Sequence, residues 1–536
     1  MTPRFIFVLA MFFCFLAQAA VPAYLMLETV DADTGKHIPS LIRITDGEGR
    51  VKELSNLLNR GIGLRKNHPA SKWYCHNGRE SVEDLQGDLM VEAFAGPEYE
   101  MTKGSMRVRA GQRVGMKLKL KRITKSRATG WRSGNTHLHI MKLTRAQADQ
   151  YLRTVPRSDG LELVFVSNLR RANAELGYIT NEHRTADLKI LESADLRFGW
   201  GEEHRHNYGG GGQGYGHVML LNIKNLVRPV SVGPGIMLEG TDDPPLQRGI
   251  REARTQGATV VWCRNSFGLE DIPNWFGGTV DAQNIFDGGT HDSYEKTFYR
   301  YLNVGLRVPF STGTDWFMYD FSRVYVRMAG ELTPERWLMG LRKGRSYISN
   351  GPLLELRCGQ NDIGDVIAID KPRKLVFRGR ARGRNDFRKL QLVYNGKVVA
   401  EAASKLLKDN ANRDRGGHHS AIVNWTLNAD KPGWIALRVD SGFTTLPATA
   451  PVAPKGKGVN EFGQGLFGHT SPIYIDYGGK RVFRPGTAKA LMKEMESAID
   501  EILKRSKFAG DAQKMQVLRI YEKGIEALER RLIVNE

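Results

Sequence analysis

Two histidines flank one leucine in the stretch Asn135-Thr-His-Leu-His-Ile-Met141. This stretch is expected to form the first strand of a central region. Because side chains two positions apart on a strand point to the same face, His137 and His139 could bind one metal ion, at about 2.0–2.1 Å. Two hydrogen-bonded core imidazoles are the alternative interpretation of this pair.

Three later segments place a carboxylate or an imidazole next to an apolar strand. They are Phe198-Gly-Trp-Gly-Glu-Glu-His-Arg-His206, Tyr215-Gly-His217 before the strand Val218–Ile223, and Thr312-Gly-Thr-Asp315 after the strand Val308–Ser311. An α/β barrel carries its site at the ends of its strands. These segments therefore indicate a site assembled from distant parts of the chain.

The central region alternates apolar strands with helical stretches. The strands are 163–166, 218–223, 259–262 and 308–311, and the helical stretches include 145–153, 245–256 and 334–343. This alternation predicts parallel strands with crossover helices, arranged as a closed or distorted α/β barrel.

The order His-x-His, Gly-x-Glu, Gly-His and strand-Gly-Thr-Asp resembles the PHP (polymerase and histidinol phosphatase) superfamily, and within it the CehA/McbA-type metallohydrolases. The resemblance covers roughly residues 134–352. It implies a distorted seven-stranded (β/α) barrel that binds up to three divalent metals at its strand ends.

Carried over position by position, the resemblance implies a metal bound by His137, His139, Glu203 and Asp315. Glu202 is the alternative to Glu203, because the register could differ by one residue. The Gly-His element supplies His217, which would contribute to a second metal position.

Three imidazoles that the resemblance implies are replaced. The positions hold Asn168, Phe317 at the Asp-x-His end, and Arg264 or, with a shifted register, Asn265. These losses fall on the second and third metal positions, so we expect one divalent metal. Two imidazoles and two carboxylates would balance its charge, and mixed nitrogen and oxygen ligands suit Zn²⁺, Mn²⁺ or Fe²⁺.

A single metal with an open coordination position can activate water for hydrolysis. Arg264 is predicted to stabilise an oxyanion, or to be a surface or ion-paired side chain. For proton transfer we consider His204, His206 and His217, each of which could instead be a solvent-exposed loop histidine. Arg323 could hold a substrate anion or pair with a structural carboxylate.

Asp281 resembles the family's Asp-Ala element ahead of a strand, and is assigned with Arg323 to substrate binding. The residues that follow it, Asp287, His291 and Asp292, are interpreted first as loop residues. Cys75, Cys263 and Cys358 allow at most one disulfide outside the leader.

The chain of 536 residues has ordinary globular composition, with 41% hydrophobic and 25% charged residues, which excludes fibrous and disordered classes. Residues 1–20 have the pattern of a secretion signal, which predicts a secreted or periplasmic protein. No later stretch is apolar enough to cross a membrane. We expect a β-sandwich over 21–124, the barrel over 125–352, a second β-sandwich over 353–480 and a helical hairpin over 481–536.

The net charge of +20 points to an anionic partner or substrate, either a small molecule or a polymer. Half of this excess positive charge lies in Lys371–Arg415, which contains fourteen basic and four acidic residues. This stretch could contact a polyanion, or be an ordinary solvated face, and no nucleic-acid-binding module is recognisable.

Two functions follow from these features. The first is an exported metal-dependent hydrolase acting on an ester, amide, carbamate or phosphoester bond. The alternative is a non-catalytic PHP-like binding or scaffold protein that recognises an acidic polymer.

Overall fold

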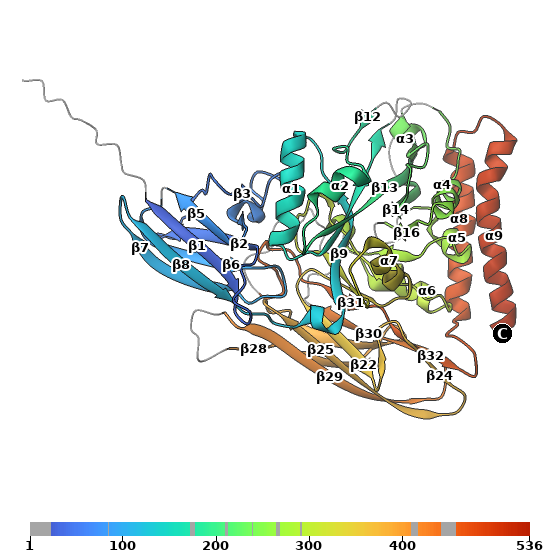
Figure 1. The fold of residues 1–536 in the computed structure, drawn as a ribbon. Coiled ribbons are helices and arrows are strands. Elements are labelled where there is room, and N and C mark those ends of the chain that lie inside the picture. Colours follow the sequence, from blue (N-terminus) through green and yellow to red (C-terminus); the bar gives the residue numbers. More distant parts are fainter. Residues whose placement is uncertain are drawn as a thin grey trace, which may run out of the picture.

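The structure is a computed structural model that describes residues 23–83, 85–171, 177–209, 213–237, 240–263, 268–289, 292–408, 416–440 and 457–535. It is mixed α/β and contains several sheets (Figure 1). The predicted secretion signal and Arg264 lie outside the described residues, as does the segment 409–415 of the basic stretch.

The N-terminal region contains two sheets that share one apolar core. Their orders are β5-β1-β8 and β3-β4-β2-β6-β7. In β1, Leu25 and Leu27 are fully buried whereas Met26 between them is 37% exposed, which is the two-residue period of a strand with one face in the core. The elements are β1 (Tyr24–Asp31), β2 (Ser40–Asp46), β3 (Leu58–Asn59), η1 (Pro69–Lys72), β4 (Tyr74–His76), β5 (Arg79–Glu83), β6 (Gly87–Phe94), β7 (Thr102–Val108), β8 (Arg113–Leu120) and η2 (Ser126–Thr129).

The central region begins with three parallel strands, β9, β10 and β13. Helix α1 connects β9 to β10, as the sequence predicts, and Thr144 and Gln147 close its first turn with a capping box. Its first half consists of β9 (Trp131–His139), α1 (Arg145–Ser158), β10 (Leu163–Asn168), β11 (Arg170–Arg171), β12 (Gly177–Tyr178), α2 (Thr185–Leu191), β13 (Arg197–Asn207), β14 (Gln213–Leu221), β15 (Ser231–Val232) and α3 (Pro234–Met237).

Strand β14 runs antiparallel to both of its neighbours, β13 and β16. The prediction of parallel strands with crossover helices was wrong at this position. Only residues 208–212 join β13 to β14, and such a short connection can link antiparallel strands but cannot hold a crossover helix.

Beyond β14, the parallel direction returns in β16, β17 and β18. The segment 310–316 pairs with β17 through β18 at its start, and with β9 through β19 at its end. The second half of the region consists of α4 (Leu246–Thr255), β16 (Thr259–Trp262), α5 (Asp271–Phe276), β17 (Ala282–Asn284), η3 (Asp287–Gly289), η4 (Glu295–Tyr299), α6 (Arg300–Leu302), β18 (Phe310–Ser311), β19 (Asp315–Trp316), β20 (Arg323–Arg327), α7 (Pro334–Arg342) and β21 (Ser346–Ser349).

The sheet continues from the central into the C-terminal region, because β21 pairs with β31 and β31 pairs with β30. A separate sheet, β23-β22-β25-β29-β28, shares an apolar core with β26 and β30. The strands are β22 (Leu353–Cys358), β23 (Asn361–Asp362), β24 (Val366–Ile369), β25 (Arg373–Gly383), β26 (Lys389–Tyr394), β27 (Lys397–Ala403), β28 (Lys405–Leu407), β29 (His418–Ala429), β30 (Gly433–Asp440), β31 (Gly468–Thr470) and β32 (Ile473–Tyr477).

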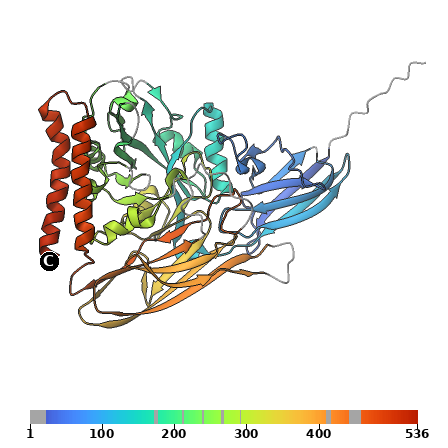
Figure 2. The ribbon, with the colours of Figure 1, turned by 180° about the vertical axis from the view of Figure 1, so that it is seen from behind.

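Two long helices, α8 (Pro485–Arg505) and α9 (Asp511–Asn535), end the chain and lie side by side against the central region (Figure 2). A Cβ on Gly524 of α9 would come within 3.0 Å of both Met495 of α8 and Pro273 of α5, so a small residue allows this close contact. Within the described part of the chain, no helix is long and apolar enough to cross a membrane.

Candidate metal centre

His137 and His139 lie at the carboxyl end of β9, and both are fully buried. Their Nε2 atoms are 2.9 Å apart and their rings are nearly perpendicular, at 85°. The strand period places both imidazoles on one face, so the two nitrogens approach the same location.

An acceptor holds the other nitrogen of each ring. His139 Nδ1 lies 2.7 Å from the carbonyl oxygen of Ser167, and His137 Nδ1 lies 2.7 Å from Asp287 Oδ2. Because a carbonyl oxygen and a carboxylate can only accept, each Nδ1 carries a proton and donates it. When both rings are neutral, the lone pairs of the two Nε2 atoms then point at each other and repel. A proton shared between them, or a bound metal ion, would remove this repulsion. Metal-binding histidines are usually held in this way.

Two carboxylates adjoin the histidines. Glu203 Oε2 on β13 lies 3.2 Å from His139 Nε2. Asp315 Oδ1 on β19 lies 3.4 Å from His137 Nε2 and 3.8 Å from His139 Nε2. Ligand atoms of His137, His139 and Asp315 all lie within 4.8 Å of one another. His137, His139 and Asp315 could therefore hold a divalent metal ion, and Glu203 lies next to His139 as a further carboxylate.

The backbone before Asp315 passes unusually close to β9. Thr314 N donates to the carbonyl oxygen of His137 over 3.0 Å. A Cβ on Gly313 would lie 2.4 Å from His137 Cβ, so this approach requires glycine. Asp315 itself has a φ of 56°, in the left-handed region that a residue with a side chain rarely adopts.

The surrounding charges suit a cation. Burial lowers the pKa of His137, but Asp287 and Asp315 outweigh it and raise that pKa well above its ordinary value. Burial raises the pKa of Glu203, but hydrogen bonds from His139 and His217 outweigh it and lower that pKa well below its ordinary value. The cluster thus favours an ionised carboxylate and positive charge near His137.

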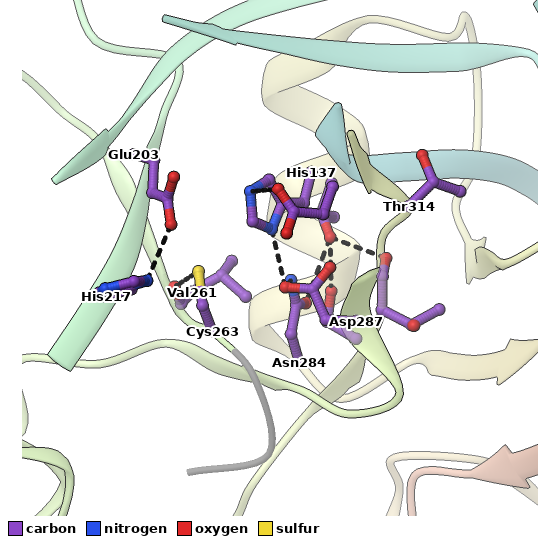
Figure 3. A network of polar contacts seen from close by, with 12 residues as sticks. His137, Glu203, His217, Val261, Cys263, Asn284, Asp287 and Thr314 are labelled. Carbon is purple, nitrogen blue, oxygen red and sulfur yellow. Dashed lines mark hydrogen bonds and ion pairs between the residues drawn. The ribbon is translucent and has the colours of Figure 1, made fainter. Parts of the chain in front are cut away.

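His217 on β14 extends the cluster beyond Glu203 (Figure 3). Its Nδ1 lies 3.0 Å from Glu203 Oε1, whereas the other oxygen of Glu203 faces His139.

Cys263 and Asp287 form a second group with His137, in which the possible ligand atoms all lie within 4.8 Å of one another. Burial raises the pKa of Cys263 to about 12, so its thiol is neutral near pH 7.

His204 lies outside the cluster, contrary to its predicted role in proton transfer. Because it follows Glu203 on β13, its side chain points to the opposite face of the sheet. There its Nδ1 lies 3.4 Å from Glu202 Oε1. Its ring also packs closely against Gly249 of α4, where an added Cβ would lie 2.2 Å from His204 Nε2. Glu202, the alternative ligand, accepts from Val227 N over 2.8 Å on that same face, which favours Glu203.

Asp281 and Arg323 also lie apart from the cluster, contrary to their assignment to substrate binding. Asp281 precedes β17, at the opposite end of the strand from Asp287, and forms an ion pair with Arg254 at 3.2 Å. Arg323 donates through Nε to the carbonyl oxygen of Phe321 over 2.9 Å. It lines a cavity of about 80 Å³ that Glu98 of the N-terminal region also lines, but among the described residues it forms no ion pair with a carboxylate.

Asp287 was predicted to be a loop residue, but its carboxylate contacts His137 of the cluster. The carboxylate lies just after β17, which ends at Asn284, and it is fully buried. The sequence contained a signal for this position, because Asp287, like Asp315, follows a strand of the central sheet. Asn168, at the position of an expected imidazole, donates to the backbone carbonyl oxygens of His183 and Gly201 over 3.2 and 3.3 Å.

Comparison with protein-family models and with curated proteins gives no match. Among solved structures, the Bacillus anthracis TIE protein is similar to a small part of the chain, with 14% identity and a TM-score of 0.15. The alignment covers 24% of this chain and 20% of that protein. A similarity of this extent carries no argument about fold or function.

Proposed function

We propose that the protein is an exported metal-dependent hydrolase of the PHP superfamily, similar to the CehA/McbA type. The observation that carries the proposal is the pair of Nε2 atoms of His137 and His139, 2.9 Å apart, with both Nδ1 atoms engaged by acceptors. Glu203 and Asp315 supply the negative charge that a divalent ion would neutralise. The proposed substrate is an ester, amide, carbamate or phosphoester.

The proposed fold is a distorted seven-stranded PHP-type barrel between two β-sandwich domains, with a helical hairpin at the C-terminal end. The order of pairing supports it, because β9, β10, β13, β14, β16, β17 and the segment 310–316 follow one another and that segment returns to β9. The predicted ligands lie along this series of strands.

The bound metal would supply a Lewis acid that polarises the substrate and activates water, and Zn²⁺, Mn²⁺ and Fe²⁺ all suit the ligands. His217 contacts Glu203 on the side away from His139, and we assign it to proton transfer. Asp287 and the carbonyl of Ser167 hold the two histidines in the tautomer that presents Nε2. Arg264 keeps its predicted role of stabilising an oxyanion.

The second candidate is a PHP-like protein that binds an acidic polymer without catalysis. Asn168 favours it, because its amide group is committed to backbone carbonyl oxygens where the resemblance implies an imidazole ligand. A site reduced to one metal could be structural.

Metal content tests the proposal directly. The purified full chain should contain about one divalent ion, and His137→Ala or Asp315→Ala should lose it. His183→Ala is the matched control, because His183 is equally buried but bonds to Asp149 at 3.0 Å, outside the cluster. Its metal content should equal that of the wild type. A wild-type chain that binds none of the three metals would overturn the proposal.

Turnover separates the two candidates. Chromogenic phosphoesters and carboxyl esters should be hydrolysed by the metal-loaded wild type and not by His137→Ala. Stoichiometric metal without hydrolysis of any substrate class named above would favour the binding protein.

A further inference from the structure

The sheet β23-β22-β25-β29-β28 has one buried and one exposed face. In β25, Leu375, Phe377 and Ala381 point into the core, and the residues between them point outward. The outward positions hold Lys374, Val376, Arg378, Arg380 and Arg382. Figures 1 and 2 both show this sheet along the outer edge of the molecule.

Positive charge is concentrated on this exposed face. Arg378 on β25 lies directly opposite Arg357 on β22, and like charges in that position repel each other. Arg357 is paired with Asp362 at 3.1 Å and Arg382 with Glu355 at 3.6 Å. Arg378, Arg380 and Lys374, by contrast, form no ion pair with any residue that the structure describes. An anionic ligand would relieve the repulsion.

The spacing of these cations suits a linear polymer. Arg378, Arg380 and Arg382 alternate along one strand, so their attachment points are about 6.6–6.8 Å apart. At the end of this row, Arg357 and Arg382 line a cavity of about 390 Å³, whose lining also includes Lys125 and the carboxylates Asp33, Glu355 and Asp362. The cavity has the usual volume of a small-molecule site but mixed charge, so the row of arginines itself, and not the cavity, carries the argument for an anionic polymer.

The remaining outward side chains favour a polysaccharide over a nucleic acid. β29 presents Asn424, Thr426 and Asn428 beside the arginines, and these groups can bond to sugar hydroxyls. Val376 and Ile422, 53% and 41% exposed, offer small apolar contacts. Among the described residues, the outward positions of β22, β25 and β29 carry no Phe, Tyr or Trp, and His418 at the start of β29 is paired with Glu100 at 2.9 Å. Single-stranded nucleic acids, by contrast, are commonly bound by aromatic stacking.

We propose that the outer face of β22, β25 and β29 binds an anionic polysaccharide, one that carries sulfate, phosphate or carboxylate groups. The arginines of β25 contact the anionic groups and the polar row of β29 contacts the hydroxyls. This surface is separate from the metal cluster, and the proposal does not depend on it.

Binding of the full chain to heparin, a sulfated polysaccharide, tests the proposal. Arg378→Ala/Arg380→Ala should weaken binding at least about tenfold, and the slope of log K against log salt should fall by about two. Arg519→Ala/Lys523→Ala is the matched control, because it removes the same charge from a groove between α4 and α9. The control should bind like the wild type.

Three results would overturn the proposal: equal weakening by both double variants, no weakening by the first, or tighter binding of single-stranded DNA than of heparin at equal salt. Arg378→Lys/Arg380→Lys retains the charge but not the forked geometry, so it should bind between the wild type and the alanine variant. Thermal unfolding checks that each variant is folded. Metal-depleted protein should bind heparin as the wild type does, which keeps this test independent of the hydrolase proposal.

Discussion

At the scale of single residues, Asp287 is the side chain whose role can be tested most sharply. Its carboxylate accepts from His137 Nδ1 over 2.7 Å and so orients the imidazole, whose Nε2 is the proposed ligand atom. We expect Asp287→Ala to weaken metal binding about 10–100-fold, as loss of such partners typically does. Zn²⁺ affinity measured by competition with a chelator checks this.

Asp281→Ala is the control for that measurement, since Asp281 lies on the same stretch of chain but pairs with Arg254. If both variants bound Zn²⁺ as the wild type does, Asp287 would have no positioning role. The Zn²⁺ affinity of Asp287→Asn should lie between those of the wild type and Asp287→Ala, because the amide oxygen can still accept from His137 but carries no charge.

Residue types and motif order predicted that His137, His139, Glu203 and Asp315 bind one metal ion. The structure places His137, His139 and Asp315 together and Glu203 beside His139, and the metal stays a prediction. Residue types and motif order could not predict where His204 points, because that depends on the strand face and therefore on whether Glu202 or Glu203 faces inward. They also could not separate Asp287 from neighbouring loop residues. That distinction requires knowing that β17 ends at Asn284.

At the scale of elements, the packing of segment 310–316 against β9 sets the position of Asp315. Gly313→Ala would place a Cβ 2.4 Å from His137 Cβ, so the segment must move away. We expect a loss of about 1–3 kcal/mol in the free energy of unfolding, together with weaker metal binding. Denaturant unfolding and metal titration measure the two effects.

Gly486→Ala in α8 is the matched control, because a Cβ there meets no atom within 4 Å. It should leave both quantities nearly unchanged. Metal affinity equal to that of the wild type in Gly313→Ala would show that the close approach does not position Asp315.

The elements that were predictable are those with strong local patterns. The helices α8 and α9 bury the faces expected from their periodicity, including Leu491, Met495, Tyr521 and Leu528. The direction of β14 was not predicted, because strand direction depends on the length and path of the connection between strands, and the apolar pattern of one short strand does not fix it.

At the scale of the whole molecule, a buried ion pair between Arg60 and Asp159 links the N-terminal region to the central region. Arg60 Nε and Nη2 donate to the two carboxylate oxygens of Asp159 over 2.9 and 2.6 Å, and both side chains are fully buried. Arg60 Nη1 also donates to the carbonyl oxygen of Met318 over 2.6 Å. Met318 lies three residues after Asp315, so this hydrogen bond links the N-terminal region to the segment that carries the proposed ligand Asp315.

Arg60→Ala should therefore lower the free energy of unfolding by about 3–5 kcal/mol, because it leaves the Asp159 carboxylate buried and unpaired. It should also weaken Zn²⁺ binding by the protein that remains folded, since the support at Met318 is lost. Arg50→Ala is the control: Arg50 is paired with Asp46 at 3.0 Å in the same region but is 69% exposed, so its loss should cost less than about 1 kcal/mol. Denaturant unfolding gives the stability, and titration below the unfolding transition gives the affinity. Reduced stability with unchanged affinity would mean that the N-terminal region stabilises the fold without positioning Asp315.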